Sequence, residues 1–333
     1  MAVYTTIDDP SLYFRVKTYS GSSSDGNAIT WDETDTNMSP NFLWLKNRTS
    51  AQEHWLCDTV RGTGKFLESN SSNAESSDGA SGFASFDSNG FTLNDSARTN
   101  RNTMVAWGWK ETADAGFDIV SYTGNAVDGR TISHSLSAVP DMYIIKNRSA
   151  TEPWMVYHGT LGNTNAMYLN TTMASTASNG YTNDTSPTSS VFSVSDWEGN
   201  NGDGNSLIAY LFTAKQGFSK FGSYTGNGNA DGTFVYTGFR PAFVMCRDTA
   251  NAAGWHIFDN KRSNSFNEIT VRLEADNSDA ENDSGPPDLD FLSNGFKFRT
   301  SFDNINRSGT THIYMAFAEA PFVNSNGVPC NAR

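Results

Sequence analysis

The sequence has 333 residues, a mass of 36.3 kDa and a formal net charge of −13 at pH 7, and this length predicts two or three domains. Its 36 Asp and Glu residues outnumber its 23 Lys and Arg residues, which argues against binding nucleic acid by neutralising phosphates. Only 37% of the residues are hydrophobic, but the 13% that are aromatic argue against disorder, so we expect exposed β structure with long turns.

The N-terminal residues, MAVYTTIDDPSLYF, contain no basic region followed by an apolar core, so we expect no secretory signal. The most apolar stretches, Met104–Trp109 and Leu207–Phe212, are far shorter than the ~18 residues that span a membrane. Synthesis in a cytoplasm, together with a surface composition like that of extracellular proteins, fits a virion part released by lysis. Three cysteines, Cys57, Cys246 and Cys330, are too few for a disulfide framework and are expected to be buried or idle thiols.

Five landmarks recur in the same order three times along the chain. The first is a Ser/Thr-Tyr-Ser/Thr-Gly element with Tyr19, Tyr122 and Tyr224, spaced by 103 and 102 positions. The second is a proline, an apolar strand and a cation: PNFLWLK (Pro40–Lys46), PDMYIIK (Pro140–Lys146) and PAFVMCR (Pro241–Arg247). The others are a tryptophan that opens a strand (Trp55, Trp154 and Trp255), a segment of FDSNGFTL type (Phe86–Leu93, Ser190–Trp197 and Phe291–Phe298) and a closing apolar run aligned on Ala106, Ala209 and Ala316. This order predicts a threefold internal repeat.

Each copy is predicted to consist of short strands, because its apolar runs have strand length and Ser-Asn-Gly or Asp-Gly turns separate them. No segment of helical length shows a 3.6-residue period. The predicted fold class is all-β, with three tandem β-sandwich domains of jelly-roll or concanavalin-like type, each of about 100 residues. We expect an N-terminal arm over residues 1–16 and sandwiches over residues 17–113, 114–214 and 215–333.

The run from Phe218 to Asp259, followed by FLSNGFKF and THIYMAFAEAPF, resembles a recurrent repeat protein of marine tailed bacteriophages. That group is identified as tail-fibre or other virion structural proteins, and the opening MAVYTTIDDPSLYF is similar to its N-terminus, so the resemblance covers almost the whole chain. It implies repeats like those of the concanavalin-like and SPRY-type β-sandwich superfamily, and a location in the virion.

From this resemblance we expect a non-enzymatic virion component, most simply a tail fibre or appendage protein that attaches to the host surface. The alternatives are a capsid-decorating or head-fibre protein and a carbohydrate-binding adhesin module. The expected partners are other virion proteins, contacted through the arm or the first sandwich, and a host cell-surface glycan. A homotrimer is the favoured oligomer, and no nucleic-acid partner is expected.

The strongest enzymatic pattern is Glu274-Ala-Asp276-Asn-Ser-Asp279-Ala-Glu281, because retaining glycosidases place two carboxyl groups close together. However, LEADNSDAE (Leu273–Glu281) aligns with LESNSSNAE (Leu67–Glu75), which lacks both aspartates. The middle copy, aligned at LNTTMA (Leu169–Ala174), has no acid. We therefore expect these acids to belong to the repeat structure and predict no catalytic residue.

No cofactor or metal ligand is predicted either. The five histidines, His54, His134, His158, His256 and His312, lack the spacing of a zinc site, and His54 and His256 are not equivalent because one precedes and the other follows its tryptophan. Oxygen-rich segments at Asn227–Gly232 and Asn200–Asn205 could bind Ca²⁺ or could be ordinary turns. Four aromatic residues in polar segments (Trp31, Tyr181, Trp197 and Phe266) could stack on sugars, or could cap the sandwich cores or form subunit contacts.

Overall fold

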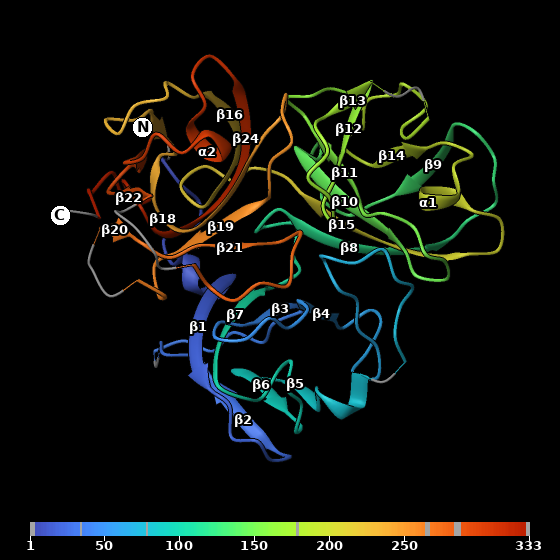
Figure 1. Ribbon diagram of the computed structural model, residues 1–333, viewed down its shortest axis with the longest axis horizontal. Helices are drawn as coiled ribbons and strands as arrows, with labels where there is room; N and C mark the ends of the chain where they lie inside the picture. Colours follow the sequence, from blue (N-terminus) through green and yellow to red (C-terminus); the bar gives the residue numbers. More distant parts are fainter. Residues whose placement is uncertain are drawn as a thin grey trace.

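The computed structural model describes residues 4–33, 35–77, 79–177, 180–263, 267–282 and 288–330. They form three β lobes around a common centre (Figure 1). Each lobe contains a larger antiparallel sheet and a separate smaller one, which confirms the predicted all-β class. Helical structure in the described residues is confined to single short turns: η1 (Pro10–Leu12), η2 (Gly79–Ser81), α1 (Glu198–Asn201) and α2 (Asp303–Asn306).

The three larger sheets have equivalent strand orders. In the first copy the order is β1 (Phe14–Ser20), β7 (Thr103–Trp109), β3 (Phe42–Asn47) and β4 (Trp55–Asp58). In the second it is β8 (Phe117–Thr123), β15 (Ser206–Phe212), β10 (Met142–Asn147), β11 (Met155–His158), β12 (Asn165–Tyr168) and β13 (Thr176–Ala177). In the third it is β16 (Ser219–Thr225), β24 (Thr311–Pro321), β18 (Phe239–Asp248), β19 (His256–Asp259) and β21 (Leu273–Glu274).

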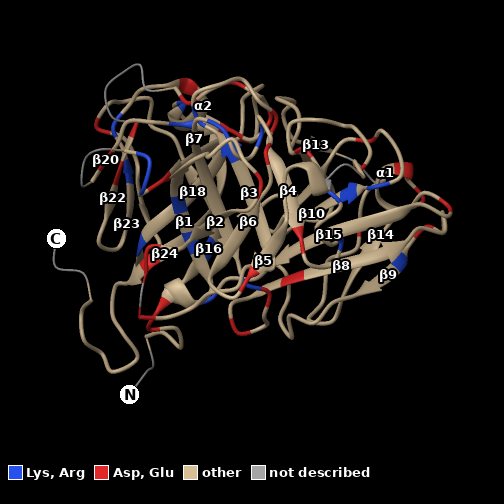
Figure 2. Ribbon diagram, turned by 90° about the horizontal axis from the view of Figure 1, so that it is seen from below, with Lys and Arg blue, Asp and Glu red and all other residues tan. Residues whose placement is uncertain are grey.

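The smaller sheets lie on the outer side of each lobe (Figure 1). The first contains β2 (Asn27–Thr30), β6 (Gly90–Leu93) and β5 (Ser85–Asp87), and the second β14 (Val191–Val194) and β9 (Arg130–Ser133). The third contains β17 (Phe234–Tyr236), β23 (Gly295–Phe298), β22 (Leu289–Leu292) and β20 (Glu268–Ile269). Charged residues lie mainly in the loops and at strand ends, as Figure 2 shows, which leaves the strand interiors to apolar residues.

The Tyr-Ser/Thr-Gly element ties the first strand of each copy to the loop before its closing strand. In the first copy the Tyr19 hydroxyl donates to Thr99 O at 2.7 Å, and the Asn100 side chain accepts the backbone N–H of Ser22 at 2.9 Å. Tyr122 and Tyr224 make the same bond at 2.7 and 2.6 Å. The glycine is required because a Cβ at Gly21 would lie 2.2 Å from the Asn100 carbonyl carbon.

Each larger sheet is buried on both faces. In β3, Leu43 and Leu45 face the smaller sheet of their own sandwich, whereas Phe42 and Trp44 face the centre of the molecule. The central faces of all three larger sheets meet in one shared core, which explains the unbroken apolar runs of β3, β10 and β18. Only about 10 Å³ of space remains between the residues around this centre, so it is a packed core and not a ligand site.

The strand register corrects the predicted alignment of the tryptophans. The equivalent residues Leu45, Ile145 and Cys246 pair with Trp55, Met155 and His256. Trp154 and Trp255 therefore correspond to His54, and Trp55 lies one residue out of register with them. Because side chains alternate between the faces of a strand, Trp55 points into its own sandwich while the other two tryptophans point to the shared core.

The described part of the predicted arm packs against the third copy. Strand β1 already begins at Phe14, and Ile7 is buried in the shared core. The Tyr13 ring meets Phe218 edge-on at 6.0 Å. The backbone N–H of Ser325 donates to Asp8 Oδ1 at 2.7 Å, so the N- and C-terminal segments lie together on the third lobe.

Candidate functional site

One hydrogen bond between neighbouring copies is repeated around the centre. In each case a side chain just before β4, β11 or β19 donates to a backbone carbonyl of another copy. The bonds are Trp154 Nε1 to Glu68 O at 2.9 Å, Trp255 Nε1 to Tyr168 O at 2.8 Å and His54 Nε2 to Glu274 O at 2.9 Å. His54 can donate from Nε2 because its Nδ1 accepts the indole N–H of Trp44 at 2.7 Å. The second copy thus donates a hydrogen bond to the first, the third donates one to the second, and the first donates one to the third. The three bonds form a closed ring.

The cation that ends the proline-strand motif makes a second contact across each boundary. Lys46, Lys146 and Arg247 are all fully buried. Lys46 Nζ donates to Ser278 O at 3.1 Å, and Lys146 Nζ donates to Ser72 O at 3.0 Å. Arg247 donates to Tyr168 O at 2.6 Å and to the carbonyl of Met173. Burial lowers the pKa of each lysine to about 8 and that of Arg247 to about 10.

Ion pairs strengthen two of the three boundaries. Arg148 of the second copy holds both carboxylate oxygens of Glu75 at 2.8 and 2.9 Å. Arg48 of the first copy holds Glu281 of the third in the same way, at 2.9 and 2.7 Å. At the remaining boundary Thr249 O accepts the backbone N–H of Ser175 at 2.9 Å, and no ion pair is present among the residues described there. Among the residues described, the boundary between the third and second copies is therefore held by hydrogen bonds and not by an ion pair.

A buried Asp–Arg pair occupies the same two boundaries near the centre. Asp58 binds Arg61 at 2.5 Å and accepts the Tyr210 hydroxyl at 2.7 Å, and Asp259 likewise binds Arg262 at 2.6 Å and accepts Trp107 Nε1 at 3.0 Å. In the middle copy the residue at the position of these aspartates is His158, whose Nε2 lies 3.3 Å from Tyr314 O. Burial lowers the pKa of His158 to about 4, so its ring is neutral at pH 7.

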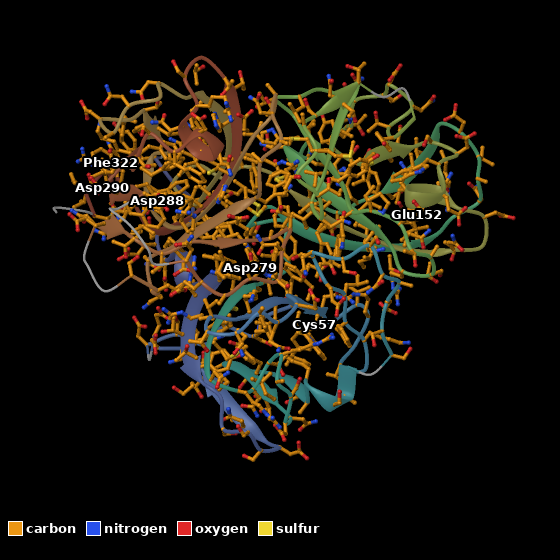
Figure 3. The ribbon with its side chains drawn as sticks, viewed as in Figure 1. Cys57, Glu152, Asp279, Asp288, Asp290 and Phe322 are labelled. Carbon is orange, nitrogen blue, oxygen red and sulfur yellow. The ribbon has the colours of Figure 1, made fainter. Side chains whose placement is uncertain are left out.

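The acids of the predicted enzymatic pattern make contacts within the third copy and across its boundary with the first. Asp276 accepts the backbone N–H of Trp255 at 2.6 Å, and Glu281 is the ion-pair partner of Arg48. Burial raises the pKa values of Glu274 and Asp276. Asp279 lies where the third lobe meets the first (Figure 3). These carboxylates therefore occupy the boundary between two copies.

The structure confirms that Asn70 replaces Asp276, because Asn70 accepts the equivalent backbone N–H of His54 at 3.1 Å. In the middle copy this acceptor is Asn170, which bonds to the N–H of Trp154 at 2.9 Å. Leu169 therefore corresponds to Ser69, and the segment Leu169–Ala174 is the counterpart of residues 69–74, without an acid, as predicted. All three copies thus have a side-chain oxygen that accepts this backbone N–H, but only Asp276 of the third copy is an acid.

Two of the histidines, His54 and His158, bond to backbone carbonyls of other copies. No group of three His, Cys, Asp or Glu side chains that could hold a metal exists within the described part of the chain. In the loop at Asn227 the side-chain oxygen accepts the N–H of Asn229 at 3.0 Å, and Asp231 pairs with Lys297 at 2.9 Å. The first is a turn contact, and the second is an ion pair that joins this loop to β23. Cys57 and Cys246 are buried, whereas Cys330 is exposed.

The three aromatic residues of this set that the structure describes do not form a common surface. Trp31 is buried in the first sandwich and donates its indole N–H to Met38 O at 2.8 Å, so it caps that core. Tyr181 and Trp197 pack edge-on against each other, with ring centroids 4.7 Å apart, and are half-buried. Phe266 lies outside the described residues. Of the three that the structure describes, Tyr181 and Trp197 lie together.

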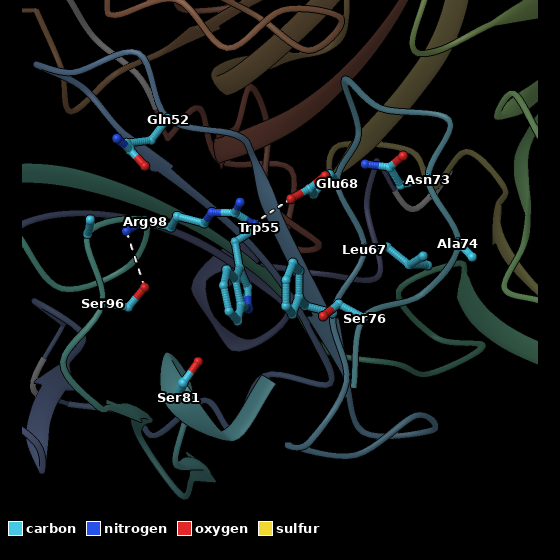
Figure 4. Close-up of a pocket in the computed structure, with 12 residues that line it drawn as sticks. Gln52, Trp55, Leu67, Glu68, Asn73, Ala74, Ser76, Ser81, Ser96 and Arg98 are labelled. Atoms are coloured by element: carbon cyan, nitrogen blue, oxygen red, sulfur yellow. Dashed lines mark hydrogen bonds and ion pairs between the residues drawn. The ribbon is translucent and has the colours of Figure 1, made fainter. Parts of the chain in front are cut away.

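A polar hollow in the first copy was not anticipated from the sequence. It has a volume of about 500 Å³ and lies between the segments at residues 52–55, 66–76, 81 and 96–98 (Figure 4). Trp55 and Phe66 stack at its base, with centroids 3.7 Å apart and ring planes 15° from parallel. Arg98 lies 5.7 Å from the Phe66 ring centre and pairs with Glu68. The sequence signal was the pair Trp55 and Phe66, whose counterparts are Met155 and Ala166 in the second copy and His256 and Arg272 in the third.

The described residues contain no helix with the length and apolar character needed to cross a membrane. A family model described as a domain of unknown function (DUF7483) matches residues 9–321, so the chain belongs to that family. Comparison with curated proteins and with solved structures gives no match.

Proposed function

We propose that this member of the DUF7483 family is a non-enzymatic structural component of a tailed-phage virion. Within the virion it acts as a tail fibre or appendage protein that contacts the host surface. The resemblance of its repeats to virion proteins of marine tailed phages supports this role. The observation that carries the proposal is the closed ring of contacts among the three copies.

The ring supports a structural role because it joins three sandwiches into one body through buried bonds. Polar groups that are far apart in sequence, such as Lys46 and Ser278, are used to hold the lobes together. A buried polar group is costly unless it is paired, so these contacts stabilise one arrangement of the lobes over others. An appendage that must keep its shape outside a cell benefits from such a body.

The ring also bears on the expected homotrimer. The faces that would join three single sandwiches about a threefold axis are buried inside one chain. We therefore propose that one chain supplies the threefold arrangement by itself, and a trimer of whole chains would need a different surface.

Imaging of the particle tests the proposal. Virions of a phage that encodes this chain are labelled with antibody against the purified protein and examined by cryo-electron microscopy. Label at the tail supports a fibre or appendage, whereas label on the head supports the capsid-decorating alternative. If intact virions carry no label anywhere, the protein is not part of the particle and the proposed structural role is overturned.

A further inference from the structure

We propose that the polar hollow of the first copy binds a neutral saccharide. This inference rests on the proposed function, because it names the class of host-surface ligand that the virion component contacts. It starts from the stacked rings of Trp55 and Phe66, which form an aromatic base beneath polar walls. Sugars combine an apolar C–H face with hydroxyl groups, and a site for them needs both kinds of surface.

The walls supply hydrogen-bonding groups and no net charge. Gln52, Asn73 and Ser96 contribute amide and hydroxyl groups, while the charges of Glu68 and Arg98 neutralise each other as an ion pair. A phosphate would meet the Glu68 carboxylate, and a cation would meet the Arg98 guanidinium. A neutral ligand with many hydroxyl groups avoids both conflicts and can bond to either member of the pair.

The base of the hollow contains an unused donor. The Trp55 side chain is 2% exposed, and its Nε1–H has no hydrogen-bond partner among the residues that the structure describes. A buried donor without an acceptor costs about 1–3 kcal/mol, and an indole N–H can only donate. A hydroxyl oxygen brought in by a ligand, after a small shift of the rings, supplies the missing acceptor.

The other two copies show that the fold does not require this arrangement. Met155 and His256 occupy the position of Trp55 in the second and third copies, by the pairing of β10 with β11 and of β18 with β19. The third copy also has a hollow at the equivalent loop, of about 380 Å³, but Glu274, Asp279 and Glu281 line it. Glu274 is the counterpart of Glu68 and Arg272 also lines this hollow, so Asp279 and Glu281 give it a net negative charge that the first hollow lacks, and it serves as an internal control.

The test measures saccharide binding by the full chain. The protein is applied to an array of neutral and anionic oligosaccharides, and the methyl glycosides of the hits are titrated by saturation-transfer NMR. Two pocket variants, Arg98→Ala and Asn73→Ala, are compared with two matched controls. Arg101→Ala removes a surface arginine paired with Asp95, and Asp279→Ala changes the residue equivalent to Asn73 in the third copy.

We expect neutral saccharides to bind, with at least about a tenfold rise in Kd for each pocket variant and no change for the controls. Circular dichroism and urea midpoints confirm that all four variants are folded. The absence of any bound neutral saccharide overturns the proposal, and so does binding that persists in both pocket variants or is lost equally with Asp279→Ala. None of these results alters where the protein lies in the virion, so imaging can fail or succeed independently.

Discussion

Replacing Glu75 with glutamine tests whether the boundary contacts stabilise the whole molecule. The Glu75 side chain is 7% exposed, and its two oxygens accept hydrogen bonds from Arg148 of the next copy at 2.8 and 2.9 Å. It also lies 3.4 Å from the buried guanidinium of Arg61. The substitution preserves the size of the side chain but leaves two arginines without their shared negative charge.

Removing one partner of a buried ion pair costs about 3–5 kcal/mol, whereas exposed pairs contribute about 0–1 kcal/mol. Arg148 is 17% exposed and can turn towards water, and Arg61 keeps its bond to Asp58 at 2.5 Å. We therefore expect the free energy of unfolding to fall by about 2–3 kcal/mol. The control is Arg101→Gln, which breaks a pair whose side chains are 48% and 37% exposed and should cost less than about 1 kcal/mol.

Urea unfolding is followed by tryptophan fluorescence and by circular dichroism. We expect one transition with a lower midpoint and an unchanged slope, because the ring makes the three copies unfold together. Equal losses for Glu75→Gln and Arg101→Gln would refute the reasoning about burial. Separate transitions for the two probes would refute the cooperative ring.

Three other predictions concern pH, backbone packing and assembly. The buried ring of His158 has a pKa of about 4 against about 6.5 in the unfolded chain, so protons bind the unfolded chain first and stability is lost as the pH falls below about 6.5. The stability difference between the native protein and His158→Gln should therefore shrink by about 2 kcal/mol from pH 7 to pH 5, and a constant difference contradicts this. Gly21→Ala should destabilise by more than about 2 kcal/mol in thermal melts because its Cβ meets backbone 2.2 Å away, whereas Gly64→Ala, with nothing within 4 Å, should be neutral. Sedimentation equilibrium should give a folded monomer of 36.3 kDa, and a stable trimer would show that whole chains associate through another surface.

Much of the architecture could be predicted because it depends on local patterns. The Tyr-Ser/Thr-Gly element and the proline-strand motif recur at nearly constant spacing, and they mark equivalent strands in all three copies. The threefold repeat and the all-β class follow from this regularity. The replacement of Asp276 by Asn70 was also found by alignment alone, because the flanking leucine and glutamate are shared, whereas their role as backbone acceptors was not predicted.

The error in aligning the tryptophans arises because the sequence of a strand that is buried on both faces does not show which face each side chain is on. Strands β3 and β4 are buried on both faces, so alternation of polar and apolar residues could not tell Trp55 from His54 as the residue that faces the centre. Closure of the ring depends on pairs such as Arg48 and Glu281, which are more than 200 positions apart and share no local signal.

The polar hollow was missed for a related reason. Its base requires Trp55 and Phe66 to stack, and its rim requires Arg98 to approach from a separate loop. Each residue alone is compatible with an ordinary sandwich. Only their meeting in space defines the site.

The contact between the terminal segments determines how the molecule responds to mechanical tension. The Ser325 N–H bonds to Asp8, and both residues rest on the third lobe. A pull applied between the two terminal segments would be resisted first by this bond and by the third lobe. The N-terminal segment continues directly into β1 of the first lobe, so load that breaks this bond passes next to the first lobe. The contact between Asp8 and Ser325 would thus shield the lobe with the polar hollow only for as long as it holds.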